Sequence, residues 1–409
     1  MKPLLVGRAV LRPFQIFFRL EAASGIVLLA ATALALGWAN SPWRELYRAV
    51  FEGPLSLTAG GHRLEFTVHA LVNDGLMAVF FFVVGMEIKR ELLTGELNTA
   101  RKAILPAVAA LGGMLVPAAI YAAINRGGPG LRGWAIPMAT DIAFSIGVLT
   151  LLKDRVPHAL IVFVTALAIF DDMGGILVIA LFYGGGVHAA WLAGAAVVTT
   201  GLLLVGRKGV GHWAVYLLFG CALWLCLHEG GVHPTIAGVL LGLAIPAGGL
   251  VPQELQTAEE SQESDKSPLS RFIHNLHPWV AYGVMPIFAL ASSGVDLSAT
   301  RAEHLLAPIT LGSALGLFVG KQAGILAFTW VAIRAGLSAT PGGAPTGQLY
   351  GVAMVAGIGF TVALFIAGLA FQEPGLLAQA KLGILIGSAA SGLAGYGFLR
   401  FAVRGPVRA

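Results

Sequence analysis

The sequence predicts an all-α membrane protein whose chain crosses the bilayer many times, and three observations support this. Hydrophobic residues make up 57% of the 409 residues and charged residues only 11%, against about 25% charged in ordinary soluble domains. Apolar stretches of about 20 residues, the length that crosses a bilayer, recur along the whole chain. Most of the 26 Lys and Arg lie between these stretches in a one-sided pattern. A soluble fold could not bury so much apolar surface, so lipid must cover it.

We predict twelve membrane-spanning helices, which make residues 1–409 a single transmembrane domain. Since Lys and Arg accumulate in cytoplasmic loops, their distribution places both termini in the cytoplasm. The same distribution accounts for the net charge of +5 without nucleic acid as a partner. The predicted spans are 20–40, 67–87, 103–124, 133–152, 157–183, 188–205, 212–227, 231–249, 276–294, 307–333, 349–371 and 378–400.

Two connecting segments differ from the others. Residues 250–272 are rich in acidic side chains, so we expect a solvated cytoplasmic linker loop rather than a domain. Residues 53–66, on the outer side, alternate apolar and polar side chains around Gly60-Gly61, a pattern typical of a small β-hairpin. An irregular loop is equally compatible with this segment.

Five ionisable side chains fall well inside the predicted spans: Asp74, Asp141, Asp171, Asp172 and Lys321. Each costs about 2.5–3.5 kcal/mol at a helix centre even on a lenient scale, so the five together cost about 12–17 kcal/mol. That sum is comparable with the whole net stability of a protein, about 5–15 kcal/mol. The five must therefore face the protein interior or a water-filled cavity. They either form ion pairs that hold helices together or act in transport, and for Asp74 both roles fit equally well.

The adjacent pair Asp171-Asp172 lies near the middle of the span 157–183. Neighbouring residues on a helix point about 100° apart, so the two carboxylates face different surroundings. One can line a water-filled funnel while the other turns toward a neighbouring helix, where Lys321 is the available buried cation. Because burial disfavours the charged form of each group, such side chains can exchange protons near physiological pH. The pair therefore indicates proton-coupled transport.

Two of the predicted spans look broken. The fourth contains Pro137 shortly before Asp141, and the eleventh contains Gly357 and Gly359. They are the middle helices of spans 3–5 and 10–12 and run antiparallel, which indicates inverted repeats with two discontinuous helices that cross at a binding site. Opposed half-helices bring like dipole ends together, so their N-termini would favour Asp141 and their C-termini Lys321.

Several of these motifs, in the same order along nearly the whole chain, resemble the NhaA family of bacterial sodium/proton antiporters. The motifs are Asn73-Asp74 with the residues up to Leu92, Ala139-Thr140-Asp141-Ile142-Ala143-Phe144-Ser145, Asp171-Asp172, Gly231-Val232-His233, His277-Pro278-Trp279-Val280-Ala281-Tyr282 and Gly357-Ile358-Gly359-Phe360-Thr361. The resemblance implies a secondary transporter, not an enzyme, that exchanges cytoplasmic Na⁺ or Li⁺ for external H⁺ by alternating access. It further implies the bacterial inner membrane, a homodimer held partly through the outer hairpin, and no cofactor.

The resemblance also implies roles for individual residues. Asp172 would be the principal ligand of the transported Na⁺, assisted by Asp171 and by the hydroxyl of Thr140, since small hard cations prefer oxygen ligands. Lys321 would pair with Asp171. Asp141 would lie beside Thr140 at the helix crossing, and Asp74 would lie along a cytoplasmic funnel.

A second set of residues matches positions that the family links to its pH response: Glu87, Arg90, Glu91, His233, His274 and His277. The family pattern has a lysine and a glutamate where this chain has Ser270 and Ile273, which weakens the expected response. A lone buried histidine such as His233 is more often a packed, hydrogen-bonded side chain than a sensor.

Two alternatives from other classes fit the sequence less well. An intramembrane aspartyl protease needs two carboxylates that face each other from separate helices, which the adjacent residues Asp171 and Asp172 cannot provide. A passive cation channel would show symmetric rings of charge rather than one site at two broken helices.

Overall fold

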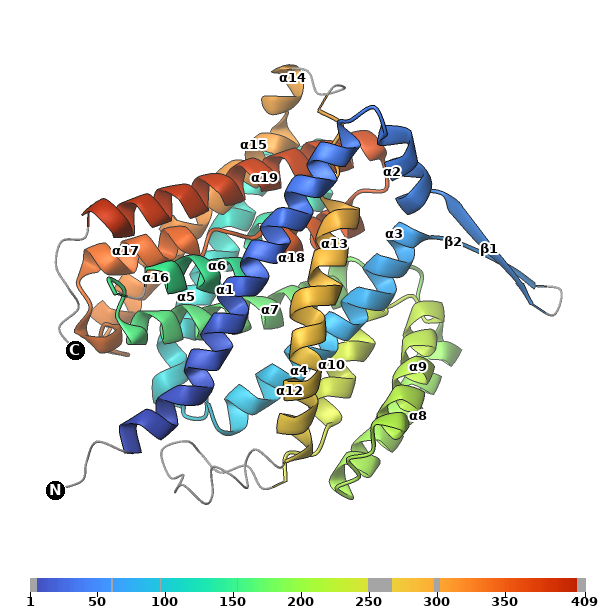
Figure 1. Cartoon of the computed structure of the whole chain (residues 1–409), viewed down its shortest axis with the longest axis horizontal. Helices are drawn as coiled ribbons and strands as arrows, with labels where there is room; N and C mark the ends of the chain where they lie inside the picture. Colours follow the sequence, from blue (N-terminus) through green and yellow to red (C-terminus); the bar gives the residue numbers. More distant parts are fainter. Residues whose placement is uncertain are drawn as a thin grey trace.

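The protein, described from a computed structural model, is a bundle of long helices from which a two-stranded ribbon projects at one side (Figure 1). The structure describes residues 6–59, 62–95, 97–152, 154–248, 267–297 and 302–402.

The elements follow one another in chain order. The helices and strands are α1 (Val6–Ala39), α2 (Arg44–Phe51), β1 (Pro54–Ala59), β2 (His62–Thr67), α3 (Val68–Ala70), α4 (Met77–Leu93), α5 (Ala100–Ile124), α6 (Ile142–Leu151), α7 (His158–Phe182), α8 (Ala189–Arg207), α9 (Trp213–Glu229), α10 (Thr235–Ala244), α12 (Pro268–Trp279), α13 (Met285–Ser292), α14 (Ala302–Leu305), α15 (Pro308–Leu315), α16 (Lys321–Arg334), α17 (Thr346–Val355), α18 (Phe360–Ala370) and α19 (Pro374–Gly397). Short 3-10 turns are η2 (Pro129–Gly133), η3 (Ile136–Met138) and η7 (Pro341–Gly343), and wider π-helical turns are η1 (Leu71–Leu76), η5 (Val280–Val284), η6 (Gly316–Gly320) and η8 (Phe398–Ala402).

The prediction of a polytopic helical membrane protein is confirmed in its coarse form. Six helices of the described chain are long and apolar enough to cross a bilayer, and up to nine spans result if each of three bent helix pairs counts as one. The six are Val68–Leu93, Ala100–Ile124, His158–Phe182, Ala189–Arg207, Pro308–Arg334 and Pro374–Ala402. Each coincides with a predicted span.

The two predicted interruptions are present. The fourth predicted span is a pair of helical segments, Pro129–Met138 and Ile142–Leu151, bent by 43°. The eleventh is the pair Thr346–Val355 and Phe360–Ala370, bent by 46°. Pro137 and the glycines at 357 and 359 therefore mark real breaks in the helices.

The eighth predicted span, 231–249, contains a much shorter helix than expected. Within the described residues, α10 has ten residues and is thus about 15 Å long, half the thickness of the hydrocarbon core. Pro234 precedes it and Pro246 follows it closely, and neither favours a longer helix. A Cβ on Gly238 would lie 2.1 Å from the Ala78 carbonyl oxygen of α4, so a glycine lets the two backbones touch.

The predicted hairpin is present as an antiparallel ribbon in which Pro54 pairs with Thr67 and Ala59 with His62. The turn at Gly60-Gly61 lies outside the described residues. Most of the predicted linker 250–272 also lies outside them, and its last residues belong to α12.

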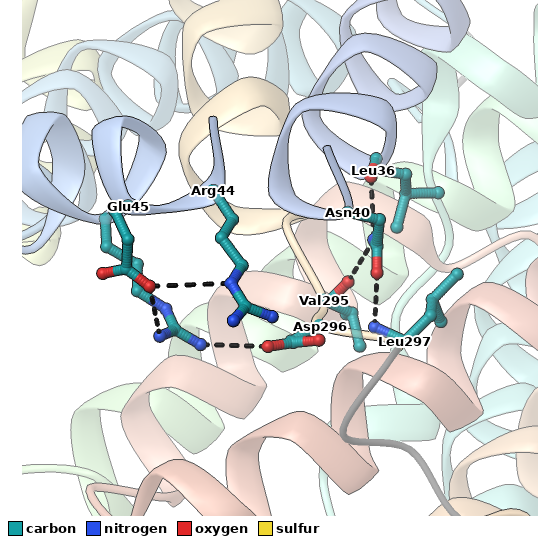
Figure 2. Close-up of polar contacts among 8 residues, drawn as sticks. Leu36, Asn40, Arg44, Glu45, Val295, Asp296 and Leu297 are labelled. Atoms are coloured by element: carbon teal, nitrogen blue, oxygen red, sulfur yellow. Dashed lines mark hydrogen bonds and ion pairs between the residues drawn. The ribbon is translucent and has the colours of Figure 1, made fainter. Parts of the chain in front are cut away.

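Polar contacts join the corner between α1 and α2 to the segment that follows α13, and we call this contact the corner clamp. The Asn40 amide donates to the Val295 carbonyl at 2.7 Å and accepts from the Leu297 amide at 2.7 Å (Figure 2). Arg48 forms an ion pair with Asp296 at 3.0 Å. The clamp fixes the end of α1 against the end of α13.

Candidate functional site

The breaks in the two interrupted helices lie against each other, and backbone groups freed by one break bond to the other. The Asp141 amide donates to the Ile358 carbonyl at 2.6 Å. The Thr140 hydroxyl lies 2.9 Å from the Ala356 carbonyl, and the Ser145 hydroxyl donates to the Val355 carbonyl at 3.2 Å. In a lipid-covered protein a backbone polar group without a partner costs several kcal/mol, so these bonds make the two breaks tolerable.

Asp141 caps the helices that begin at both breaks. Its Oδ1 accepts from the Phe144 amide at 3.1 Å, at the first turn of α6. Its Oδ2 accepts from the Thr361 amide at 3.0 Å, at the first turn of α18, and also from the Thr361 hydroxyl. A carboxylate between two helix N-termini is favoured by both dipoles, which agrees with the sequence argument. Thr361, which belongs to the motif Gly357–Thr361, is a site residue that the sequence pattern alone does not identify.

Lys321 provides the matching positive charge at the same place. It is fully buried, and its ammonium donates to Asp171 Oδ2 at 2.7 Å and to the Met138 carbonyl, the last residue of η3. The predicted pairing of Lys321 with Asp171 is present in the structure. A carbonyl at a helical C-terminus attracts a cation, as the sequence argument expected for Lys321.

Asp171 and Asp172 face different surroundings, as their helical spacing requires. Asp171 Oδ2 accepts from Lys321 and from the Thr140 hydroxyl at 2.7 Å. Asp172 instead lines a cavity of about 70 Å³. Its Oδ1 is buried and accepts no hydrogen bond from any described residue. Asp172 is thus the carboxylate that remains available to a guest in the cavity.

The cavity combines apolar walls with a few oxygen-bearing and ionisable side chains. The helices α1, α4, α6, α7, α12, α13 and α18 and the turn η5 contribute to its wall. Its polar lining residues are Ser24, Glu87, Thr140, Asp141, Asp172, His277 and Thr361. The structure therefore brings Thr140, Asp141 and Asp172 together, as predicted, with Asp171 and Lys321 directly behind them.

Asp74 lies elsewhere in the structure. It belongs to the π-helical turn η1 and is not among the residues that line the cavity. Its Oδ1 lies 3.7 Å from His233 Nε2, and Trp224 Nε1 donates to its backbone carbonyl at 3.1 Å. His233 Nδ1 lies 2.8 Å from the Thr235 hydroxyl, which leaves Nε2 as the ring nitrogen on the side of Asp74. The contact fits the alternative of a pair that joins helices.

Of the six candidates for the pH response, only Glu87 and His277 line the cavity. His277 Nδ1 lies 3.1 Å from Glu87 Oε1, and both side chains line the cavity. Arg90 and Glu91 pair with each other at 3.8 Å outside the lining. His274 is exposed. Only the pair of Glu87 and His277 therefore shares a space with Asp172.

A multi-pass helical chain with carboxylates and a lysine buried at two broken helices has the features of a secondary transporter. Residues 15–399 match the family described as Na⁺/H⁺ antiporter 1. The chain is 56% identical to an Na⁺/H⁺ antiporter NhaA of Anaeromyxobacter sp. (strain Fw109-5), over 97% of this chain and 93% of the relative. It is 53% identical to Na⁺/H⁺ antiporter NhaA 1 of Myxococcus xanthus, over 98% and 96%. With the relative of Rhodospirillum rubrum the identity is 50%, over 95% and 97%.

The chain belongs to this family of sodium/proton antiporters, and is a membrane transporter rather than an enzyme. The resemblance found in the sequence motifs is thereby confirmed.

The buried pair of Lys321 and Asp171 yields a first prediction. Lys321→Ala leaves Asp171 without its cation and should lower stability by about 3–5 kcal/mol. A double variant, Lys321→Met with Asp171→Leu, should recover part of that loss, because no unpaired charge stays buried. Thermal unfolding of the purified protein in detergent measures both effects. Arg334→Ala, at the exposed end of the same helix, is the control and should melt like wild type. An unchanged melting temperature for Lys321→Ala would contradict this account.

Proposed function

We propose that the protein exchanges cytoplasmic Na⁺, or Li⁺, for external H⁺ through the cavity, with Asp172 as the principal ligand of the transported cation. One observation supports this above all. Asp172 lines the cavity with a buried Oδ1 that accepts no bond from the described residues. Asp141 is held by the amides of two helix N-termini, and Asp171, whose Oδ1 also accepts no such bond, is paired with Lys321 through Oδ2 and does not line the cavity. The proposal rests on that difference and on the family of the chain.

The surroundings of Asp172 suit a small hard cation. Such ions bind oxygen ligands, and the Thr140 hydroxyl and the Asp141 carboxylate line the same cavity. Protons compete with the cation for Asp172, because one carboxylate cannot hold both. Release of the cation on one side and uptake of a proton there complete one half of an exchange cycle.

Asp172→Asn tests the ligand role. The amide is nearly isosteric but neutral, so the fold should be kept while sodium binding and sodium-driven proton movement are lost. Isothermal calorimetry of the purified protein and a pH-sensitive dye in everted vesicles measure the two effects. Asp154→Asn, at an exposed position before α7, serves as the matched control and should behave like wild type. Sodium binding that persists unchanged in Asp172→Asn would reject the assignment.

We also propose that exchange is electrogenic. If Na⁺ displaces one proton from Asp172 and another from the coupled pair of Asp171 and Lys321, more than one proton crosses for each sodium ion. The contact between Asp171 and Lys321 at 2.7 Å supports such coupling, because a change of charge on one partner acts directly on the other. Membrane voltage would then drive sodium out of the cell.

Transport currents on a solid-supported membrane test this stoichiometry. Wild-type protein should give a current when sodium is added, since net charge moves in each cycle. Lys321→Ala should reduce or reshape the current, because the second proton site loses its partner. The absence of any current in active wild-type protein would mean one-for-one exchange.

The proposed cycle is alternating access in a single transporter domain, 1–409. In this proposal the chain crosses a bacterial inner membrane twelve times, with both termini in the cytoplasm. Spans 3–5 and 10–12 form inverted repeats whose middle helices cross at the two breaks, and a homodimer forms through the ribbon. The two bent helix pairs support the repeats. Labelling of single cysteines with membrane-impermeant reagents, followed by cross-linking across the ribbon, checks topology and assembly.

We further propose that competition between protons and sodium sets most of the pH dependence, and that Glu87 and His277 adjust it. On the proposed topology this pair lies at the cytoplasmic end of the cavity. Both side chains line the cavity, so the charge of the pair acts on a cation that enters. His274 is exposed and has no such position.

Replacement of His274 and His277 together by glutamine should shift the activity profile by less than about one pH unit. Most of that shift should already appear in the single variant His277→Gln, while His274→Gln serves as its control. The measurement is exchange rate against pH at limiting and saturating sodium. If the double variant loses all pH dependence at saturating sodium, control resides in these histidines and competition is not the mechanism.

A further inference from the structure

One polar group in the cavity comes from α1, a helix with no part in the proposed mechanism so far. Ser24 is fully buried and lines the same cavity as Asp172. The other α1 residue in the lining, Leu28, is apolar. No ionisable residue or helix break drew attention to this position in the sequence, because a serine in an apolar helix ordinarily bonds to its own backbone.

Ser24 differs from the other hydroxyl residues of the cavity lining in the helix that carries it. Thr140 bonds to Asp171 or Ala356, and Thr361 bonds to Asp141, so both hydroxyls belong to the network that closes the helix breaks. Ser24 comes from α1, a helix that contains neither of these two breaks. A hydroxyl that donates its proton still presents lone pairs to a cation, so its own hydrogen bond does not prevent coordination.

The position of Ser24 is fixed by the packing of α1. The corner clamp joins the far end of α1 to the segment after α13, through Asn40 and through the ion pair of Arg48 with Asp296 (Figure 2). Toward the cavity, α1 packs against α6 and α13. A ligand oxygen contributes more affinity when little freedom is lost on binding, and the packing of α1 against α6 and α13 limits the movement of the backbone that carries Ser24.

We propose that the Ser24 hydroxyl is a further ligand of the transported cation, which binds between Ser24 on α1 and Asp172 on α7. This inference rests on the proposed role of Asp172 as the principal ligand. The affinity for a cation that binds to both α1 and α7 depends on the distance between these helices. Ser24 thereby contributes to affinity for small monovalent cations in the conformation with this cavity.

Two substitutions of Ser24 test the proposal. Ser24→Ala removes the oxygen, and Ser24→Cys replaces it with sulfur in nearly the same volume, a poor ligand for a hard cation. Both variants should raise the KM for Na⁺ about three- to tenfold with kcat unchanged. Thr32→Val is the matched control, because its hydroxyl lies on the same helix, bonds to the Leu28 carbonyl at 2.7 Å and is outside the cavity lining. It should keep the wild-type KM.

The outcomes separate this inference from the proposed function. A packing role for Ser24 predicts that Ser24→Cys keeps the wild-type KM, and that result would overturn the inference, as would a wild-type KM in Ser24→Ala. Asp172→Asn is assayed in parallel. If it keeps sodium binding, the role of Asp172 fails. If it loses binding while both Ser24 variants bind like wild type, only the role of Ser24 fails.

Discussion

The structure depends on satisfying the polar backbone groups of two interrupted helices inside a protein that is surrounded by lipid. Each break leaves amides and carbonyls without helical partners, and no water from the bilayer core can satisfy them. Here Asp141 accepts from amides at the start of both following helices, and Lys321 donates to the Met138 carbonyl at the end of η3. A buried charge such as that of Asp141 or Lys321 would be unfavourable on its own. At the breaks it becomes favourable, because it binds amides or a carbonyl that have no helical partner. The breaks and the buried charges stabilise each other.

Because of these contacts at the breaks, the three carboxylates differ in how available they are to a cation in the cavity. Asp171 is engaged by Lys321 and Thr140, and Asp141 by the helix ends, so their charges serve the architecture first. Asp172 follows Asp171 directly but points about 100° away along the same helix, into the cavity. A single step in sequence therefore separates a carboxylate that is paired with Lys321 from one that lines the cavity, the proposed cation ligand. If Asp172 is the ligand as proposed, a substitution at Asp171 or Asp141 should alter folding as well as transport, whereas Asp172→Asn should alter transport alone.

Features with a strong local signal in the sequence could be predicted. Pro137 and the glycines at 357 and 359 interrupt apolar stretches, and buried charges are rare enough to stand out, so the breaks and the pairing of Lys321 with Asp171 could be predicted. Thr361 and Ser24 could not be chosen in the same way. Hydroxyl residues are common in membrane helices, and which of them reaches a cavity depends on how each helix is rotated against its neighbours. The short length of α10 was missed because its apolar sequence continues beyond its last turn.

The shortness of α10 has a consequence for how the chain enters a membrane during synthesis. A helix of ten residues is too short to partition into a bilayer as an independent unit, which takes about 20 apolar residues. Its glycine face fits directly on the backbone of α4, a helix made some 150 residues earlier in the chain. We therefore expect α10 to be stable in the membrane only when it packs against α4. In this chain the order of synthesis and the order of packing are tied together at Gly238.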